Sequence, residues 1–146
     1  MATNIKIIDV YSANRISFEQ IVADGFTGII FKAGQGTWPD VPRVRGTWWQ
    51  DAKSVGLMRG WYWLKDARYK PSLEFDALQR ATGLDFGELG MWVDVEKPVI
   101  TMKDRDYNRL PYRGYKFVYD LMYRIQQSGA SGFNERLPGV YTSPGA

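Results

Sequence analysis

The chain has 146 residues, a length that fits one domain and is sufficient to bury a hydrophobic core. It contains no histidine and no cysteine, which excludes a Ser-His-Asp triad, a thiol nucleophile, disulfide bonds and the usual histidine or cysteine metal sites. The net charge of +3 is too small to indicate a nucleic-acid partner, and no apolar segment approaches the roughly 18 residues of a membrane span.

The sequence predicts strands alternating with helices. We expect strands at 5–10, 26–33, 57–64, 90–96 and from 138 onward, and helices at 18–23, 48–55, 72–82 and 112–127. Ser17 with Gln20 predicts a capping box, Ser72 is the expected N-cap of 72–82, and the glycines and proline of 34–40 indicate a loop. This order implies parallel strands joined by right-handed crossovers.

The most informative segment is 90–98, where a largely apolar run leads directly into Asp94, Glu96 and a proline. Side chains alternate along a strand, so Asp94 and Glu96 share one face while Val93 and Val95 point the other way. Glycoside hydrolysis needs such a pair, one acid to protonate the leaving oxygen and one carboxylate to support positive charge. The alternative is a solvated strand end with two ordinary surface acids.

Residues able to perform chemistry follow the carboxyl ends of the predicted strands. They are Asp9, Gln35, Tyr62, Asp94 with Glu96, and Tyr141. An open doubly wound sheet would spread these residues along a crevice, whereas a barrel would bring them to one mouth. A single site needs convergence, so this distribution favours an α/β fold built as a (β/α)-barrel of the TIM type.

Five segments resemble glycoside hydrolase family 25, the muramidases common among phage endolysins and bacterial autolysins. In chain order they are 8–12 (Ile-Asp-Val-Tyr-Ser), 29–37, 52–63, 92–96 (Trp-Val-Asp-Val-Glu) and 139–143. The resemblance covers nearly the whole chain, which we interpret as a single catalytic domain at 1–146. The family barrel has eight strands, so we expect a partial barrel of about five strands and a C-terminally incomplete domain.

The resemblance also implies an activity, the hydrolysis of the β-1,4 bond between N-acetylmuramic acid and N-acetylglucosamine in peptidoglycan. It implies that Glu96 is the general acid/base and that Asp94 and Asp9 orient the sugar or stabilise positive charge. It implies no cofactor and no metal. Among the possible routes, we favour attack by the substrate's own N-acetyl group, steadied by Asp94, with retention of configuration.

Substrate contacts are expected from five further side chains, which are Gln35, Trp38, Tyr62, Trp63 and Tyr141. Trp61 and Trp63 share a strand face opposite to Tyr62, and one of these faces is expected to form core.

Bacterial peptidoglycan is the expected partner, with no nucleic acid and no membrane insertion, and open sheet edges predict possible self-association. The first residues show no signal peptide, so a phage-encoded protein released at lysis, or one associated with the virion, is expected. The alternative function is a non-catalytic cell-wall-binding or phage structural module with a muramidase-like fold.

Overall fold

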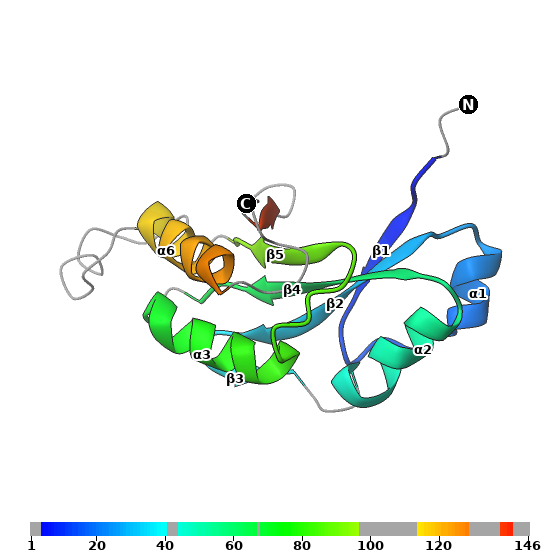
Figure 1. The fold of residues 1–146 in the computed structure, drawn as a ribbon, viewed down its shortest axis with the longest axis horizontal. Helices are drawn as coiled ribbons and strands as arrows, with labels where there is room; N and C mark the ends of the chain where they lie inside the picture. Colours follow the sequence, from blue (N-terminus) through cyan, green and yellow to red (C-terminus); the bar gives the residue numbers. More distant parts are fainter. Residues whose placement is uncertain (1–3, 41–43, 67, 97–113, 129–137, 142–146) are drawn as a thin grey trace.

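The computed structural model describes residues 4–40, 44–66, 68–96, 114–128 and 138–141 (Figure 1). The strands are β1 Ile7–Val10, β2 Gly28–Gln35, β3 Trp38–Pro39, β4 Met58–Leu64, β5 Gly90–Asp94 and β6 Gly139–Tyr141. The helices are α1 Phe18–Ala23, the π-helix η1 Val44–Trp48, α2 Trp49–Ser54, α3 Pro71–Thr82 and α6 Gly114–Gln127. Within these ranges, no helix has the length and apolar character needed to cross a bilayer.

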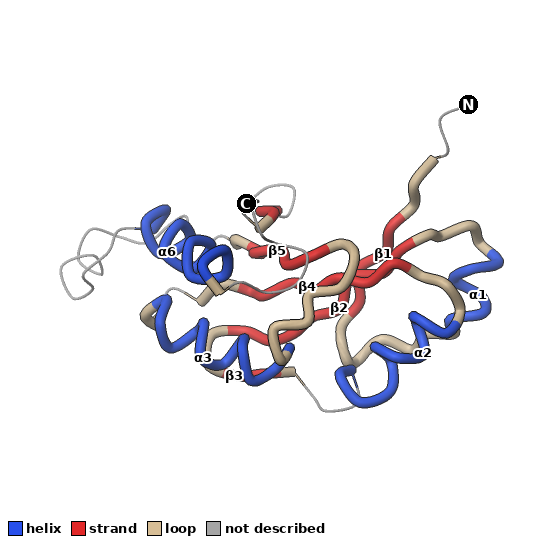
Figure 2. The backbone as a smooth tube through the Cα atoms, viewed as in Figure 1, coloured by secondary structure: helices blue, strands red, loops and turns tan. Residues whose placement is uncertain are grey.

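The strands form one sheet (Figure 2). Their order is β1-β2-β4-β5-β6, and every pair along this path is parallel. The short β3 pairs with β2 in the antiparallel sense. The predicted α/β fold with a parallel sheet is therefore confirmed. In the described residues, β1 and β6 end the sheet without pairing to one another, so these strands form an open sheet.

The hydrophobic core lies between one face of the sheet and the helices. Alternate residues of the three central strands fill it, namely Ile29, Phe31, Ala33, Trp61, Trp63, Met91 and Val93, followed by Val95 just past β5. Burial of large apolar side chains is the main stabilising term of such a fold, at roughly 1.5–3 kcal/mol for each. Because Val93 and Val95 belong to the core, Asp94 and Glu96 lie on the opposite, open face, as the alternation predicted.

Three tryptophans, Trp49, Trp61 and Trp63, are the largest side chains of this core. The Trp49 ring of α2 stacks on the Trp61 ring of β4 with centroids 4.2 Å apart, and the Arg59 guanidinium lies 4.4 Å from the Trp49 centroid. Arg59 also forms an ion pair of 3.3 Å with Glu88, on the connection before β5. These contacts fix α2 against the sheet and leave the carboxyl ends of the strands to the polar side chains.

Helix starts were predicted with mixed success. Ser17 is the N-cap of α1, and its Oγ accepts a hydrogen bond of 3.2 Å from the Gln20 N–H. The Gln20 side chain does not complete the capping box, because it donates to Asp24 Oδ1 instead. Ser72 is not the N-cap of α3. The helix begins one residue earlier at Pro71, whose fixed φ and missing N–H suit the first helical position.

Candidate active site

The open face of the sheet carries polar side chains in register. One layer, counted across the strands, holds Lys32, Tyr62 and Trp92, and the next layer toward the carboxyl ends holds Gln35, Leu64, Asp94 and Tyr141. Asp9 belongs to the layer below Tyr62, since it pairs with Ile30. Neighbouring strands are about 4.8 Å apart, so these residues lie close together at one edge of the sheet.

Four carboxylates lie near enough to Tyr62 for their charges to act on its phenol. Burial raises the pKa of Tyr62, and the negative charges of Asp9, Asp94, Asp40 and Glu96 raise it further. Asp94 is buried with 6 % of its surface exposed, whereas Asp9 and Glu96 are exposed. The arrangement places one acid deep in the site and another within reach of a ligand on the open face.

These acids do not form an obvious metal centre. In the parts of the chain that the structure describes, no group of three acidic side chains is placed to hold a metal ion. The end of β5 is held to β4 by the backbone, because Lys65 N–H donates to the Asp94 carbonyl at 2.9 Å. Asp94 is therefore fixed by the sheet itself.

Asp40 is the acid that sequence reasoning missed, because 34–40 was expected to be an irregular loop. Gly36, with φ of +57°, and Thr37 form a two-residue turn, and β3 folds back onto β2. The Asp40 N–H then donates to the Ala33 carbonyl at 2.7 Å, and Ser12 Oγ donates to Asp40 Oδ1 at 2.8 Å. A glycine at the first position of a two-residue turn is a hairpin signal that the sequence did contain.

The predicted substrate contacts have different outcomes. Trp38 lies on β3 with 71 % of its surface exposed, and Tyr62 is half-buried on the open face. The structure contradicts the expectation for Trp63, which is fully buried on the helix-facing side, opposite Tyr62, as the alternation along β4 requires. The Tyr141 backbone pairs with Asp94, but its side chain lies outside the described residues.

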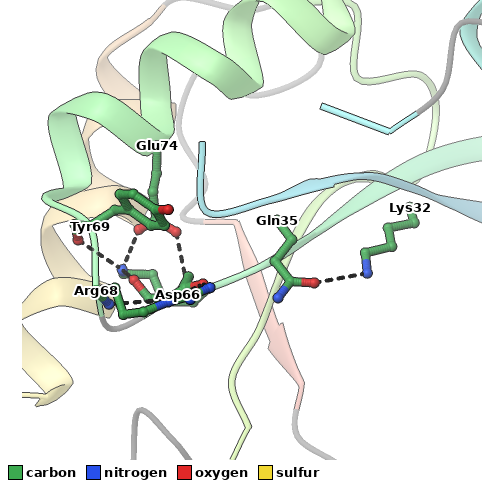
Figure 3. A network of polar contacts seen from close by, with 7 residues as sticks. Lys32, Gln35, Asp66, Arg68, Tyr69 and Glu74 are labelled. Atoms are coloured by element: carbon green, nitrogen blue, oxygen red, sulfur yellow. Dashed lines mark hydrogen bonds and ion pairs between the residues drawn. The ribbon is translucent and has the colours of Figure 1, made fainter. Parts of the chain in front are cut away.

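A bulge in β2 brings Gln35 onto the open face. The pairing with β4 shifts between Lys32 and Gly34, so that Lys32 pairs with Tyr62 while Gln35 pairs with Leu64. Tyr62 and Leu64 share a face, so Lys32 and Gln35 do as well, although residues three apart in a regular strand would point oppositely. Figure 3 shows the result, a hydrogen bond of 3.3 Å from Lys32 Nζ to Gln35 Oε1.

Gly34 is required for this bulge. A Cβ atom at Gly34 would lie 2.5 Å from the Trp38 carbonyl oxygen and 2.6 Å from the Trp63 ring. The buried Trp63 indole thus packs directly beneath the strand that carries Lys32 and Gln35. Trp63 supports the site from the core side rather than contacting a ligand.

A buried ion pair anchors the segment that follows β4. Lys65 and Glu74 pair with no side-chain surface exposed, and Lys65 Nζ also donates to the Asp66 carbonyl at 2.7 Å. Glu74 Oε1 accepts from the Asp66 N–H at 2.9 Å. The Arg68 guanidinium lowers the pKa of Asp66 through a hydrogen bond. These contacts tie the end of β4 to α3, one strand away from Asp94.

Comparison with known proteins identifies the fold. No family model matches the sequence, and no curated protein gives a significant match. The structure is similar to a family GH25 lysozyme from Aspergillus fumigatus, with a TM-score of 0.70 and 18 % identity over 94 % of this chain and 65 % of that one. A muramidase from Trichobolus zukalii gives the same TM-score and the same coverage, at 20 % identity.

A third similar structure is the modular autolysin LytC from Streptococcus pneumoniae, in complex with a synthetic peptidoglycan ligand. Its TM-score is 0.59 at 15 % identity, over 94 % of this chain and 32 % of that one. The chain spans about 65 % of the length of the fungal enzymes. With its parallel sheet, its helical layer and its acids at the carboxyl edge, this chain has the fold of the family 25 lysozymes and muramidases.

Proposed function

We propose that this chain is a glycoside hydrolase of the muramidase type, which cleaves the β-1,4 bond between N-acetylmuramic acid and N-acetylglucosamine in peptidoglycan. One observation carries the proposal. In a fold shared with lysozymes, the charges of Asp9, Asp40, Asp94 and Glu96 converge on Tyr62 at the carboxyl edge of the sheet. Glycoside hydrolysis depends on carboxylates gathered around one bond.

Each acid has a role that fits its exposure. Glu96 is exposed, so it can reach the glycosidic oxygen, protonate the leaving group and later activate water. Asp94 is buried beside it and orients the substrate's N-acetyl group, which attacks the anomeric carbon and preserves its configuration. Asp9, on β1 in the layer below Tyr62, stabilises the positive charge that develops on the sugar in the transition state. Gln35, Trp38 and Tyr141 contact the sugars.

The decisive experiment compares the protein with its Glu96→Gln variant on bacterial wall suspensions. Loss of turbidity and release of reducing ends are measured together. We expect the wild type to clear the suspension and Glu96→Gln to lower the rate by at least about 100-fold, since a positioned acid typically contributes 10²–10⁴. Glu19→Gln, an exposed change on α1, is the matched control and should keep full activity. A Glu96→Gln variant with wild-type rate would contradict the assignment.

Two further measurements define the reaction. NMR of the first product should show the retained anomer, and an inverted product would exclude attack by the N-acetyl group. Binding to the wall without clearing would instead support the alternative, a non-catalytic wall-binding or phage structural module. Release at phage lysis, or carriage on a virion, stays a prediction of how the protein reaches its substrate.

A further inference from the structure

Lys32 is a cation in an acidic site, and its ammonium group is bonded to a neutral amide instead of a carboxylate. It lies on the open face of β2, half-buried, directly across from Tyr62 in β4. In the described residues, its ammonium group has a single hydrogen-bond partner, Gln35 Oε1 at 3.3 Å, and no carboxylate within ion-pair distance. The charges of four acids act on the neighbouring Tyr62 phenol, yet among the described residues Lys32 forms an ion pair with none of them.

A neutral amide orients an ammonium group without cancelling its charge. Gln35 does this only because the bulge at Ala33 turns it to the same face as Lys32, and the bulge depends on Gly34. The pair is therefore built into the backbone of β2. Partial burial strengthens the attraction of the ammonium group for any anion placed beside it. Lys32 can then compensate the negative potential that Asp9, Asp40, Asp94 and Glu96 would impose on an anionic ligand.

We infer that Lys32, held by Gln35, is a specificity-determining residue that binds a carboxylate carried by the glycan. This inference rests on the proposed function. A muramic acid residue differs from N-acetylglucosamine by a lactyl group ending in a carboxyl, which is free or joined to a stem peptide that itself carries carboxylates. Either carboxylate supplies the same chemistry. Lys32 thus favours a carboxylated glycan over a neutral one.

The test separates charge recognition from turnover. Binding is measured by calorimetry in the Glu96→Gln background, with three probes: a peptide-free muramic acid glycan, the same glycan with its carboxyls reduced to alcohols, and a peptide-bearing glycan. We expect the reduced glycan to bind roughly 10- to 100-fold more weakly than the peptide-free glycan, as expected for a hydrogen bond to a charged group. A preference seen only with the peptide-bearing glycan assigns the stem peptide as the source of the carboxylate.

Variants of the pair sharpen the result. Lys32→Met should remove the preference for the carboxylated glycan while leaving affinity for the reduced glycan within about twofold, and Lys32→Arg should restore most of the preference. Gln35→Glu should act like Lys32→Met, because a carboxylate at this position would neutralise the ammonium group. Lys53→Met, exposed on α2, is the control.

Two outcomes would overturn the inference. One is equal loss of affinity for the charged and reduced glycans in Lys32→Met, which would indicate a structural role. The other is a site with its native Lys32 and Gln35 that binds the reduced, the peptide-free and the peptide-bearing glycans equally. Neither outcome depends on hydrolysis, so failure of the inference and failure of the proposed muramidase activity are distinguishable. Absence of cleavage by the wild type would overturn the activity alone.

Discussion

Removing the ammonium group of Lys65 tests what holds the end of β4 against α3. Lys65 and Glu74 form an ion pair with no exposed side-chain surface, and Glu74 Oε1 also accepts the Asp66 N–H at 2.9 Å. Lys65→Met keeps the length of the side chain but removes its charge. The variant therefore leaves a carboxylate buried with a backbone donor and without its cation, the situation in which buried pairs become costly.

The magnitude follows from the pKa of Glu74. Burial raises this pKa to about 7 from an ordinary 4.5, although Lys65 acts in the opposite direction. At about 1.4 kcal/mol per pH unit, this difference corresponds to about 3 kcal/mol for keeping Glu74 ionised. Loss of Lys65 removes a stabilising charge, so the pKa of Glu74 rises further. We expect Lys65→Met to lower the free energy of unfolding by about 3–5 kcal/mol near pH 8.

The pH dependence has a definite sign. A carboxyl group whose pKa is raised in the folded state stabilises folding when protonated, and this contribution is lost as pH rises through the folded value. The Lys65→Met penalty is therefore full only above the still higher pKa that Glu74 has in the variant. It shrinks as the pH falls toward about 7, and below that pH it stays small because Glu74 is protonated in both folded proteins. Near pH 5, we expect the free energy of unfolding of Lys65→Met to come close to that of the wild type.

Urea denaturation followed by tryptophan fluorescence at pH 8 and pH 5 measures both quantities. The double variant Lys65→Met/Glu74→Leu removes the stranded carboxylate and should recover much of the loss at pH 8, while Lys53→Met should match wild type at both values. Equal stability of Lys65→Met and wild type at pH 8 would refute the reasoning, and so would a penalty that does not change between pH 8 and pH 5.

Two further predictions concern the neighbourhood of β2. Gly34→Ala should destabilise the protein by about 1–3 kcal/mol, because its Cβ would collide with the Trp38 carbonyl and the Trp63 ring. Thermal melting checks this against Gly46→Ala, where nothing lies within 4 Å of the new atom, and equal melting of the two variants would exclude a required bulge. Ser12→Ala should lower kcat/KM on peptidoglycan about fivefold through loss of the 2.8 Å bond to Asp40, a change of about 1 kcal/mol. An unchanged rate in Ser12→Ala would show that Asp40 needs no such support.

Which face of a central strand is buried could be predicted from the sequence, because it depends on local periodicity. Valines alternating with acids in 93–96 correctly predicted which face of β5 is buried, and Ser17 marked the start of α1. Parallel pairing of the strands followed from their alternation with helices. These features need only nearest neighbours in the sequence and a general rule of packing.

Features that depend on one backbone irregularity were missed. Gln35 was expected at the site, but the bulge that turns it to the open face was not predicted, because strict alternation from Lys32 would place Gln35 on the other face. Asp40 was overlooked for a similar reason, since its position depends on the turn at Gly36. Trp63 was expected to contact the substrate. Consecutive residues of a strand point to opposite faces, so Tyr62 and Trp63 cannot both do so, and Trp63 is the one that is buried in the core. The tertiary environment decided the bulge, the turn and which of the two faces of β4 became core, and none of the three follows from local periodicity.

Asp9 and Tyr62 lie on strands that differ in how many neighbouring strands they are bonded to. β4 has a strand on each side, whereas β1, in the described sheet, is bonded to β2 alone. A strand at the margin of a sheet opens more readily than one at its centre, because fewer bonds must break. A reaction that needs both Asp9 and Tyr62 is therefore lost as soon as β1, the less stable of the two strands, opens. On heating, we expect activity to be lost at a temperature at which β2, β4 and β5 are still folded, so that inactivation precedes global unfolding as a separate transition.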